Sequence, residues 1–87
     1  MKLVIAILKD SDSDAVIQAL TSGQFRVTRI ASTGGLLRRG VATLLVGVED
    51  EKVDAAIEVI RASTPEPPPN EKRATIFVVD VARHIQV

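Results

Sequence analysis

Apolar positions follow two different spacings along the chain, and the shorter spacing predicts four strands. In residues 3–8, 41–48 and 74–79, Val, Ile, Leu and Ala dominate at odd-numbered and even-numbered positions alike, so both faces of each predicted strand are apolar. A strand that is apolar on both faces is typically buried on both. Residues 25–32 are rich in Val, Thr and Ile and predict the remaining strand. By the two-residue period, one face of this strand holds Arg26, Thr28, Ile30 and Ser32.

The longer spacing predicts a first helix over about residues 13–22. Ser11 and Asp14 precede its apolar positions like a capping box with Asp in place of Glu, so we expect Ser11 to cap the helix. Gly23 follows the last periodic residue and is predicted to end the helix as a left-handed cap. The predicted apolar face, at i, i+3 and i+4 spacing, consists of Val16, Ala19 and Leu20.

A second helix is predicted to open at residues 49–51, with Asp50 as its cap. The segment 63–73 ends it, because its run of prolines suits neither a helix nor a central strand. We expect this proline-rich segment to be an extended connector. The functional alternative is that this segment is itself a ligand for a proline-binding module, which the same composition would suit. The apolar face of this helix consists of Val53, Ala56, Ile57 and Ile60.

The predicted order of elements is β-α-β-β-α-β. Right-handed crossovers then give an α+β, ferredoxin-like sandwich, in which a four-stranded antiparallel sheet carries both helices on one face. Residues 1–87 are expected to form this one domain. Because three strands are apolar on both faces, the uncovered face needs a partner surface, and copies of the same chain are the simplest candidates.

Composition narrows the environment and the partners. The chain has 11 Lys and Arg against 11 Asp and Glu, so no net charge attracts nucleic acid polymers or anionic membranes. It has no cysteine, which excludes disulfides and is consistent with the cytoplasm. No apolar run approaches the length that spans a bilayer, and residues 1–8 lack the cleavage site of a signal peptide. A domain of 87 residues without disulfides gains support from oligomerisation.

Several activities lack the residues that they need. RNA binding on the sheet requires stacking aromatics, and the only aromatic residues are Phe25 and Phe77. One histidine and no paired nucleophile provide no catalytic constellation, so we expect no enzyme. An acylphosphatase-type enzyme shares the order of elements, but its phosphate loop is not recognisable. Asp10, Asp12 and Asp14 are spaced like calcium ligands, yet the turn glycine and closing Glu of a calcium loop are missing.

A glycine-containing loop at residues 31–40 is the strongest candidate for binding chemistry. Gly34 and Gly35 permit a tight turn whose exposed N–H groups can bind an anion. Arg38 and Arg39 stand beside them, and Arg26, Thr28 and Thr33 converge on the same region. We predict that this loop binds a phosphate-bearing ligand. An ordinary hairpin turn with two solvated arginines is the alternative.

Nearly the whole chain resembles the PII-like cyclic-di-AMP receptor family of bacteria. This resemblance implies a cytoplasmic homotrimer that is related to nitrogen-regulatory PII proteins. It further implies that the trimer binds cyclic-di-AMP or another nucleotide between subunits, has no cofactor and no catalytic activity, and signals to a downstream protein that is unknown. The segments that carry the resemblance are residues 1–7, 25–28, 33–38 with Gly40, Gly47-Val48, 74–78 and Gln86.

The resemblance also implies a set of ligand-binding residues. The chain departs from the family pattern at Leu36, where the family typically has Phe, and at Val41, where it typically has Asn. The loop before the last strand is also shortened to the proline-rich segment. We interpret the chain as a PII-like signalling protein for a nucleotide, most simply cyclic-di-AMP. A trimer with a structural or protein-interaction role that has lost or changed its ligand is the alternative. The implied ligand-binding residues are Arg26, Thr28, Gly35, Leu36, Leu37, Gly47, Phe77 and Gln86.

Overall fold

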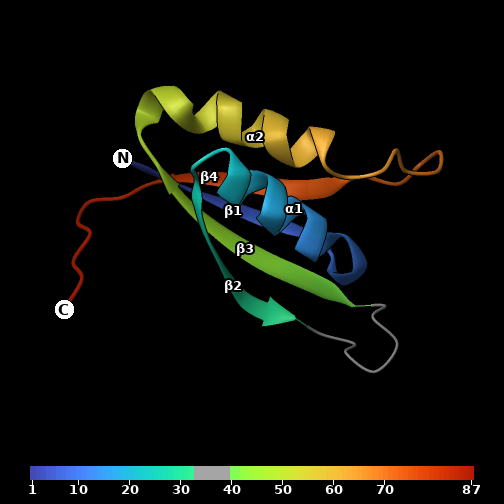
Figure 1. Ribbon diagram of the computed structural model, residues 1–87, viewed down its shortest axis with the longest axis horizontal. Helices are drawn as coiled ribbons and strands as arrows, with labels where there is room; N and C mark the ends of the chain where they lie inside the picture. Colours follow the sequence, from blue (N-terminus) through green and yellow to red (C-terminus); the bar gives the residue numbers. More distant parts are fainter. Residues whose placement is uncertain (33–39) are drawn as a thin grey trace.

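The computed structural model describes residues 1–32 and 40–87, and its strands and helices follow the predicted order (Figure 1). A single 3₁₀ turn precedes the second helix. Each predicted element is present, with ends that differ from the prediction by a few residues. The elements are β1 (Lys2–Lys9), α1 (Asp10–Ser22), β2 (Arg26–Ser32), β3 (Val41–Val48), the 3₁₀ turn η1 (Asp50–Lys52), α2 (Val53–Ala62) and β4 (Ala74–Asp80).

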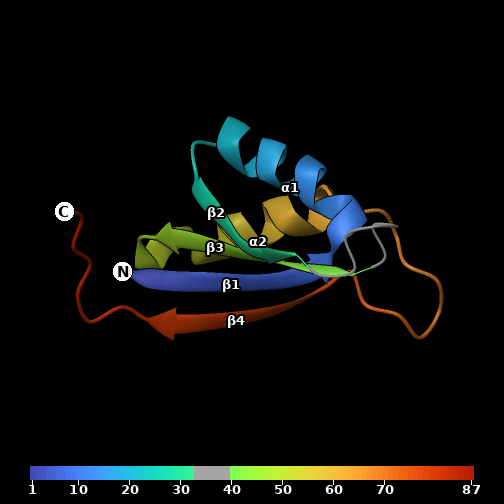
Figure 2. The same ribbon diagram turned by 90° about the horizontal axis from the view of Figure 1, so that it is seen from below.

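The four strands form one antiparallel sheet in the order β2-β3-β1-β4. Figure 2 shows both helices on the same side of this sheet, while no element of the described residues lies on the other side. This is the ferredoxin-like arrangement that the order of elements predicts, and it is confirmed. The two central strands, β1 and β3, pair along all eight of their residues. The outer strands, β2 and β4, leave one backbone edge each without a partner strand in the described part of the chain.

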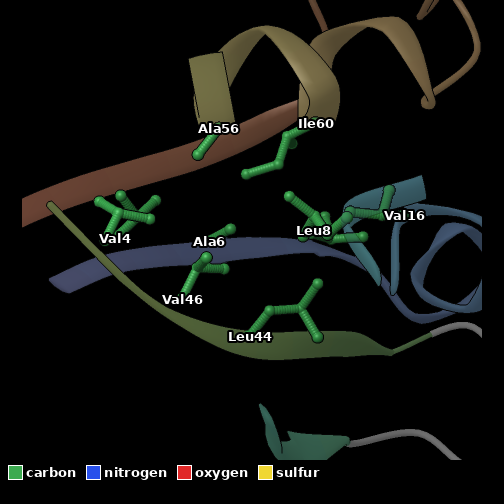
Figure 3. Packing of buried hydrophobic residues seen from close by; sticks show 10 residues of the cluster. Val4, Ala6, Leu8, Val16, Leu44, Val46, Ala56 and Ile60 are labelled. Carbon is green, nitrogen blue, oxygen red and sulfur yellow. The ribbon is translucent and has the colours of Figure 1, made fainter. Parts of the chain in front are cut away.

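The hydrophobic core lies between the sheet and the helices (Figure 3). On β1 and β3, every second residue faces the helices and is buried, as a two-residue period requires. The cluster is completed by Val16 and Leu20 of α1 and by Ala56 and Ile60 of α2. The predicted apolar faces of both helices are therefore confirmed, with Ala19 and Ile57 partly buried at their margins. The buried strand residues of this cluster are Val4, Ala6, Leu8, Leu44, Val46 and Val48.

The opposite face of the sheet, here called the open face, is organised in rows that cross all four strands. In one row, Thr28 pairs with Leu45, Leu45 with Ile5, and Ile5 with Phe77. Residues directly opposite each other in a ladder project to the same side, so each row shares one face. No described element covers this face, and Phe77 is 52% exposed. The adjacent row runs through Arg26, Gly47, Leu3 and Val79.

Both ends of α1 differ from the prediction. The helix begins at Asp10 directly after β1, and no side chain caps it, so the expected cap at Ser11 is wrong. The backbone N–H of Asp10 instead donates to the carbonyl of Gly40 at 2.9 Å, which satisfies a donor at the helix start without a side-chain cap. At the other end Gly23 has φ −82°, and Gln24 takes the left-handed conformation with φ 67°.

Two further predictions require correction. Asp50 does not cap α2, because it lies in η1 and its carboxylate pairs with the Met1 amino group at 3.0 Å. The alternation predicted for β2 stops before Ile30, because the register with β3 shifts between Arg29 and Ala31. This β-bulge places one extra residue in β2 and ends the regular two-residue period. Beyond the bulge Ser32 stands opposite Ala42 of the buried set, so the predicted run of four residues on one face is broken.

Candidate functional site

A cavity of about 390 Å³ opens on the open face, at the end of the sheet that carries both chain termini (Figure 1). Four residues of the predicted binding set line it, although they come from two strands and the C-terminal tail: Arg26, Thr28, Gly47 and Gln86. Register brings the strand residues together, since Arg26 pairs with Gly47 and Thr28 with Leu45. The remaining residues of the lining are Met1, Leu3, Leu45, Val81 and His84.

The tail reaches this cavity because β4 is held at its end by β1. The ammonium of Lys2 donates a hydrogen bond to the carboxylate of Asp80, and this bond raises the pKa of Lys2. The N–H of Val81 then donates to the carbonyl of Met1 at 3.1 Å. The chain continues from there past His84 to Gln86, both on the cavity wall.

The polar groups of the cavity suit an anionic ligand with hydrogen-bonding edges. Arg26 is exposed, and no carboxylate of the described residues forms an ion pair with it. Its guanidinium is always charged and can bind a phosphate in bidentate fashion. Thr28 and Gln86 supply donors and acceptors, and Leu3 and Leu45 supply apolar wall. A ligand that carries both a phosphate group and an aromatic base matches this combination of charged, hydrogen-bonding and apolar groups.

Gly47 is in mid-row between Arg26 and Leu3. A glycine within a strand weakens it, so it usually reflects a close approach by something else. A Cβ atom built at Gly47 would meet only the Cε atom of the Met1 side chain, at 3.6 Å, which is an ordinary contact. The packing of this protomer therefore does not require a glycine at this position. The space over Gly47 is available to a ligand or to another backbone.

Phe77 does not line this cavity within the protomer. It shares a row with Thr28, but β3 and β1 lie between their strands. Three interstrand spacings separate them, about 14 Å at the usual strand distance. The participation of Phe77 in the same site remains a prediction.

Gly35, Leu36 and Leu37 of the predicted set lie outside the described residues, as do the other residues of the predicted phosphate loop from Thr33 to Arg39. Their neighbours show where this segment joins the sheet. β2 ends at Ser32 and β3 begins at Val41, about six strand residues from Arg26 and Gly47. At roughly 3.3 Å per residue, this is on the order of 20 Å along the strands.

Sequence reasoning missed Met1, Leu3, Leu45, Val81 and His84 as cavity residues. Alternation alone assigns Leu3 and Leu45 to faces of their strands, but it does not say which residues of other strands stand opposite. That information comes from the pairing of Leu3 with Gly47 and of Thr28 with Leu45. No sequence pattern marked His84 as a cavity residue, because it lies several residues after the last strand.

A second cavity of about 390 Å³ shares Met1, Arg26 and Gly47 with the first. It lies at the same end of the sheet, where the α1–β2 turn meets η1. Near it, the amino group of Met1 donates a hydrogen bond to Asp50 and lowers the pKa of that carboxyl. Arg26 thus borders two hollows, and a ligand held by its guanidinium has room on either side. The further residues of this second cavity are Gly23, Gln24, Phe25, Val48, Glu49 and Lys52.

Two other expectations bear on the kind of site. Asp10, Asp12 and Asp14 lie in the first turns of α1, where residues two apart do not face each other. Among residues 1–32 and 40–87, no group of three His, Cys, Asp or Glu side chains is arranged to hold a metal ion. In the same part of the chain, neither helix has the length and apolar character needed to cross a bilayer.

Comparison with known proteins agrees with the fold. A solved structure of a functionally unknown protein from Pediococcus pentosaceus ATCC 25745 matches with a TM-score of 0.76 and 28% sequence identity, over 99% of this chain and 96% of that one. The family model for the cyclic-di-AMP receptors matches residues 1–66, which hold Arg26, Thr28 and Gly47. The family match covers residues 1–66 of the 87, and the chain belongs to the cyclic-di-AMP receptor family.

Proposed function

We propose that this protein is a PII-like signal-transduction protein of the bacterial cytoplasm, which binds cyclic-di-AMP in clefts between the subunits of a homotrimer and catalyses no reaction. The observation that carries the proposal is the cavity on the open face, where Arg26, Thr28 and Gly47 come together in a chain of the cyclic-di-AMP receptor family. The ligand relays its signal to a downstream protein.

The open face supports a site between subunits. Its exposed apolar residues include Val41, Phe77 and Val79, which are 47%, 52% and 41% exposed. Exposed apolar surface of this kind favours association between copies, and a closed symmetric assembly buries this surface in every copy. When open faces of neighbouring copies meet, Phe77 of one copy can stand over the cavity of the next. The distance between Phe77 and Thr28 within one protomer then presents no obstacle.

Each cavity residue has a role that its chemistry suits. Arg26 binds a phosphate, and Thr28 and Gln86 hydrogen-bond the polar edge of an adenine. Leu3 and Leu45 form an apolar floor, while Phe77 of the neighbouring copy stacks on a base. Gly47 leaves room for the ligand to lie against the sheet. The segment that holds Gly35, Leu36 and Leu37 joins the sheet on the order of 20 Å from Arg26, so these residues are proposed to reach the cleft from the neighbouring copy.

A second candidate function is a trimer that interacts with other proteins without cyclic-di-AMP. The specific observation in its favour is the loss of two side chains typical of the family, because Leu36 stands where the family typically has the aromatic Phe and Val41 where it has the polar Asn. Val41 is at the start of β3 and is 47% exposed. An apolar side chain there presents no hydrogen bond to a ligand. This candidate predicts the same assembly as the first.

Calorimetric titration tests the proposal, with cyclic-di-AMP as ligand and ATP and cyclic-di-GMP as comparisons. We expect binding of cyclic-di-AMP with one ligand per subunit. Arg26→Gln should weaken it by about tenfold or more, because a charge-assisted hydrogen bond contributes on the order of 1.5–3 kcal/mol. Arg29→Gln is the matched control, because Arg29 belongs to the same strand but forms an ion pair with Asp14 of α1.

Sedimentation of the same samples separates the two candidates. A trimer that binds cyclic-di-AMP supports the receptor. A trimer that binds none of the nucleotides at high micromolar concentration supports the second candidate. A folded single protomer at micromolar concentration would contradict both.

A further inference from the structure

A separate groove lies on the helix side of the sheet, between α2 and the outer strand β4. Its volume is about 290 Å³, and the segment between α2 and β4 forms its outer wall. Side chains of Ile57 and Ile60 from α2 and of Ala74 and Ile76 from β4 make its floor apolar. None of the residues that line it belongs to the cavity on the open face. The groove exists because α2 crosses a sheet whose last strand has no neighbour beyond it.

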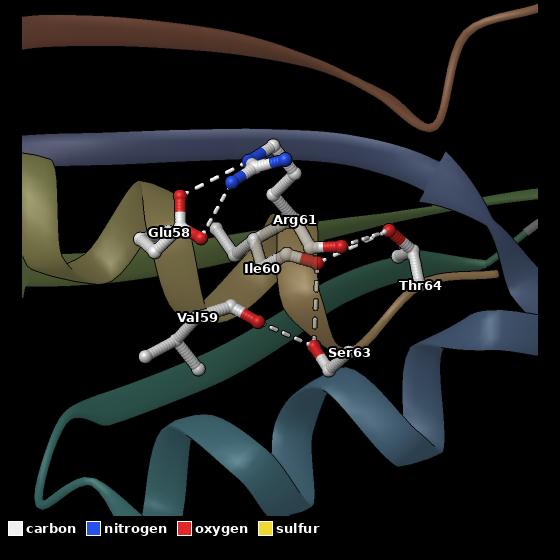
Figure 4. A network of polar contacts seen from close by, with 6 residues as sticks. All are labelled: Glu58, Val59, Ile60, Arg61, Ser63 and Thr64. Atoms are coloured by element: carbon white, nitrogen blue, oxygen red, sulfur yellow. Dashed lines mark hydrogen bonds and ion pairs between the residues drawn. The ribbon is translucent and has the colours of Figure 1, made fainter. Parts of the chain in front are cut away.

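The wall of the groove is held in place by the end of α2 (Figure 4). The hydroxyl of Ser63 donates to the carbonyl of Val59 at 2.7 Å, and that of Thr64 donates to the carbonyl of Ile60 at 3.2 Å. Thr64 is only 6% exposed. The Thr64 bond satisfies a carbonyl at the helix end, and the Ser63 hydroxyl adds a second donor to the Val59 carbonyl, which also accepts from the Ser63 N–H at 3.0 Å. Together these bonds set the direction in which the chain departs toward Pro67.

The rim of the groove carries an excess of positive charge. Two of its charged residues are already engaged. The Nε and Nη2 atoms of Arg61 donate to Glu58 at 3.0 and 2.6 Å, and Glu71 pairs with Lys9 at 3.4 Å. Lys72 and Arg73 form no ion pair with any described residue. The protein as a whole has no net charge, so this local pair of free cations stands out.

Arg73 shows a second sign of a missing partner. Its Nε atom is buried and makes no hydrogen bond within the described part of the chain. Buried donors are nearly always satisfied, because a buried donor without an acceptor destabilises the folded protein. Because Nε is shielded from solvent in the free protein, an acceptor from outside reaches it only when the Arg73 side chain turns toward the rim, and that acceptor would then also neutralise the guanidinium. A carboxylate next to an apolar side chain has this chemistry.

We propose that this groove is a docking site for an extended, acidic segment of a partner protein, which inserts an apolar side chain between α2 and β4 and places carboxylates on Arg73 and Lys72. Charge complementarity selects the acidic segment. The backbone edge of β4 pairs only with β1 in the described structure, so its other side is open to an added strand. Along the same strand Val78 is 43% exposed and continues the apolar surface.

The size and lining of the groove favour a side chain over a nucleotide. Its volume falls at the lower end of pockets that enclose small ligands, roughly 300–1,000 Å³. The described residues that line it include no aromatic side chain on which a base could stack. The inference does not depend on cyclic-di-AMP binding, because the two sites share no residue. It assigns the protein a surface through which a signalling partner can bind.

Nuclear magnetic resonance of the isotope-labelled full chain tests the inference. The probe is the acetylated peptide Val-Asp-Leu-Asp-Val-Glu, and the comparison peptide has lysine at the three acidic positions. We expect the acidic peptide at millimolar concentration to shift the amide signals of Ala74, Ile76 and Ile57. The lysine peptide should leave them unchanged. Signals of Arg26 and Thr28 should not move with either peptide.

Two groove variants and one control complete the test. Arg73→Leu should bind the acidic peptide at least about tenfold more weakly, since it lacks a charge-assisted contact. It should melt at the same temperature as the parent or higher, because it removes a buried donor without an acceptor. Lys72→Gln should weaken binding as well. Lys52→Gln, at the opposite end of α2, should leave it unchanged.

Each alternative result would overturn the docking site. No amide shift at millimolar acidic peptide excludes it, and equal shifts with the lysine peptide exclude its charge selection. A marked fall in the melting temperature of Arg73→Leu would mean that Arg73 supports the fold instead. In that case Lys72→Gln still tests the groove, and unchanged affinity of this variant for the acidic peptide would also contradict the proposal.

Discussion

Thr28 and Phe77 occupy opposite ends of one row across the open face, joined through Leu45 and Ile5. Their side chains project to the same side of the sheet, yet two strands keep them about 14 Å apart. The proposed site between subunits takes the two residues from different copies of the chain. This relationship makes the proposed intersubunit site testable by mixing variants.

A mixture of two inactive variants should recover binding. Arg26→Ala removes the phosphate contact and Phe77→Ala removes the stacking wall, so each alone should bind cyclic-di-AMP weakly. In randomly mixed trimers, about a quarter of the clefts combine an intact Arg26 with an intact Phe77 from its neighbour. Titration after joint unfolding and refolding should detect these clefts. Unchanged weak binding in the mixture would place both residues in the same subunit.

A charge on the open face should prevent assembly. Val79→Asp introduces a carboxylate at the edge of this face, where Val79 is 41% exposed and pairs with Leu3. Burying that carboxylate against a second copy without a partner is unfavourable, so we expect single protomers in sedimentation. Circular dichroism should remain that of the folded protein. Ala55→Asp, on the exposed side of α2, is the control and should assemble normally.

Replacement of Gly47 should separate stability from binding. Gly47→Ala adds a Cβ whose only close neighbour in the protomer is the end of the flexible Met1 side chain. Because glycine within a strand is less stable than alanine by roughly 0.5–1 kcal/mol, the melting temperature should stay equal or rise. Cyclic-di-AMP should bind more weakly, since the methyl group occupies space that the ligand uses. A lower melting temperature with unchanged affinity would contradict this role.

Restoring an aromatic side chain at position 36 should strengthen binding. Stacking of a base on an aromatic ring contributes about 1–3 kcal/mol, so Leu36→Phe should lower the dissociation constant for cyclic-di-AMP by about tenfold. Calorimetry of the two proteins side by side measures the change. Ile30→Phe, in the irregular part of β2, is the comparison and should not improve affinity. An equal gain from both variants would indicate nonspecific apolar attraction.

The pairing of Asp50 with the Met1 amino group should make stability depend on pH in the acid range. Folding lowers the pKa of Asp50 below its ordinary value of 3.8, with the hydrogen bond from the amino group as the main cause. The pair therefore stabilises the protein above that value, and its contribution is lost as the pH falls through the folded pKa. Asp50→Asn should melt lower than the parent at pH 6.

The difference between the Asp50→Asn variant and the parent should vanish near pH 2, which thermal melts across the range would show. Glu51→Gln provides the control, because Glu51 belongs to the same 3₁₀ turn but forms no ion pair with the described residues. A constant difference at all pH values would assign the effect of Asp50→Asn to backbone preference instead of charge.

The element types and their order could be predicted from the sequence because they depend on local spacing. Short, nearly continuous apolar runs marked β1, β3 and β4, and the i, i+3, i+4 set from Val53 to Ile60 marked α2. The order then left few topologies, and the ferredoxin-like sheet was the simplest. Arg26, Thr28 and Gly47 were also reached from the sequence, through the resemblance of whole segments to a family.

Register and helix ends were decided only by the tertiary structure. The start of α1 at Asp10 depends on the carbonyl of Gly40, and the bulge after Arg29 depends on how β2 meets β3. The cavity includes Leu3 because its strand pairs with β3, and it includes His84 because the tail is held where the N–H of Val81 donates to the carbonyl of Met1. These pairings join residues that are far apart in the sequence, so no local pattern predicts them. A hydrophobic period, by contrast, repeats within each element and can be recognised there.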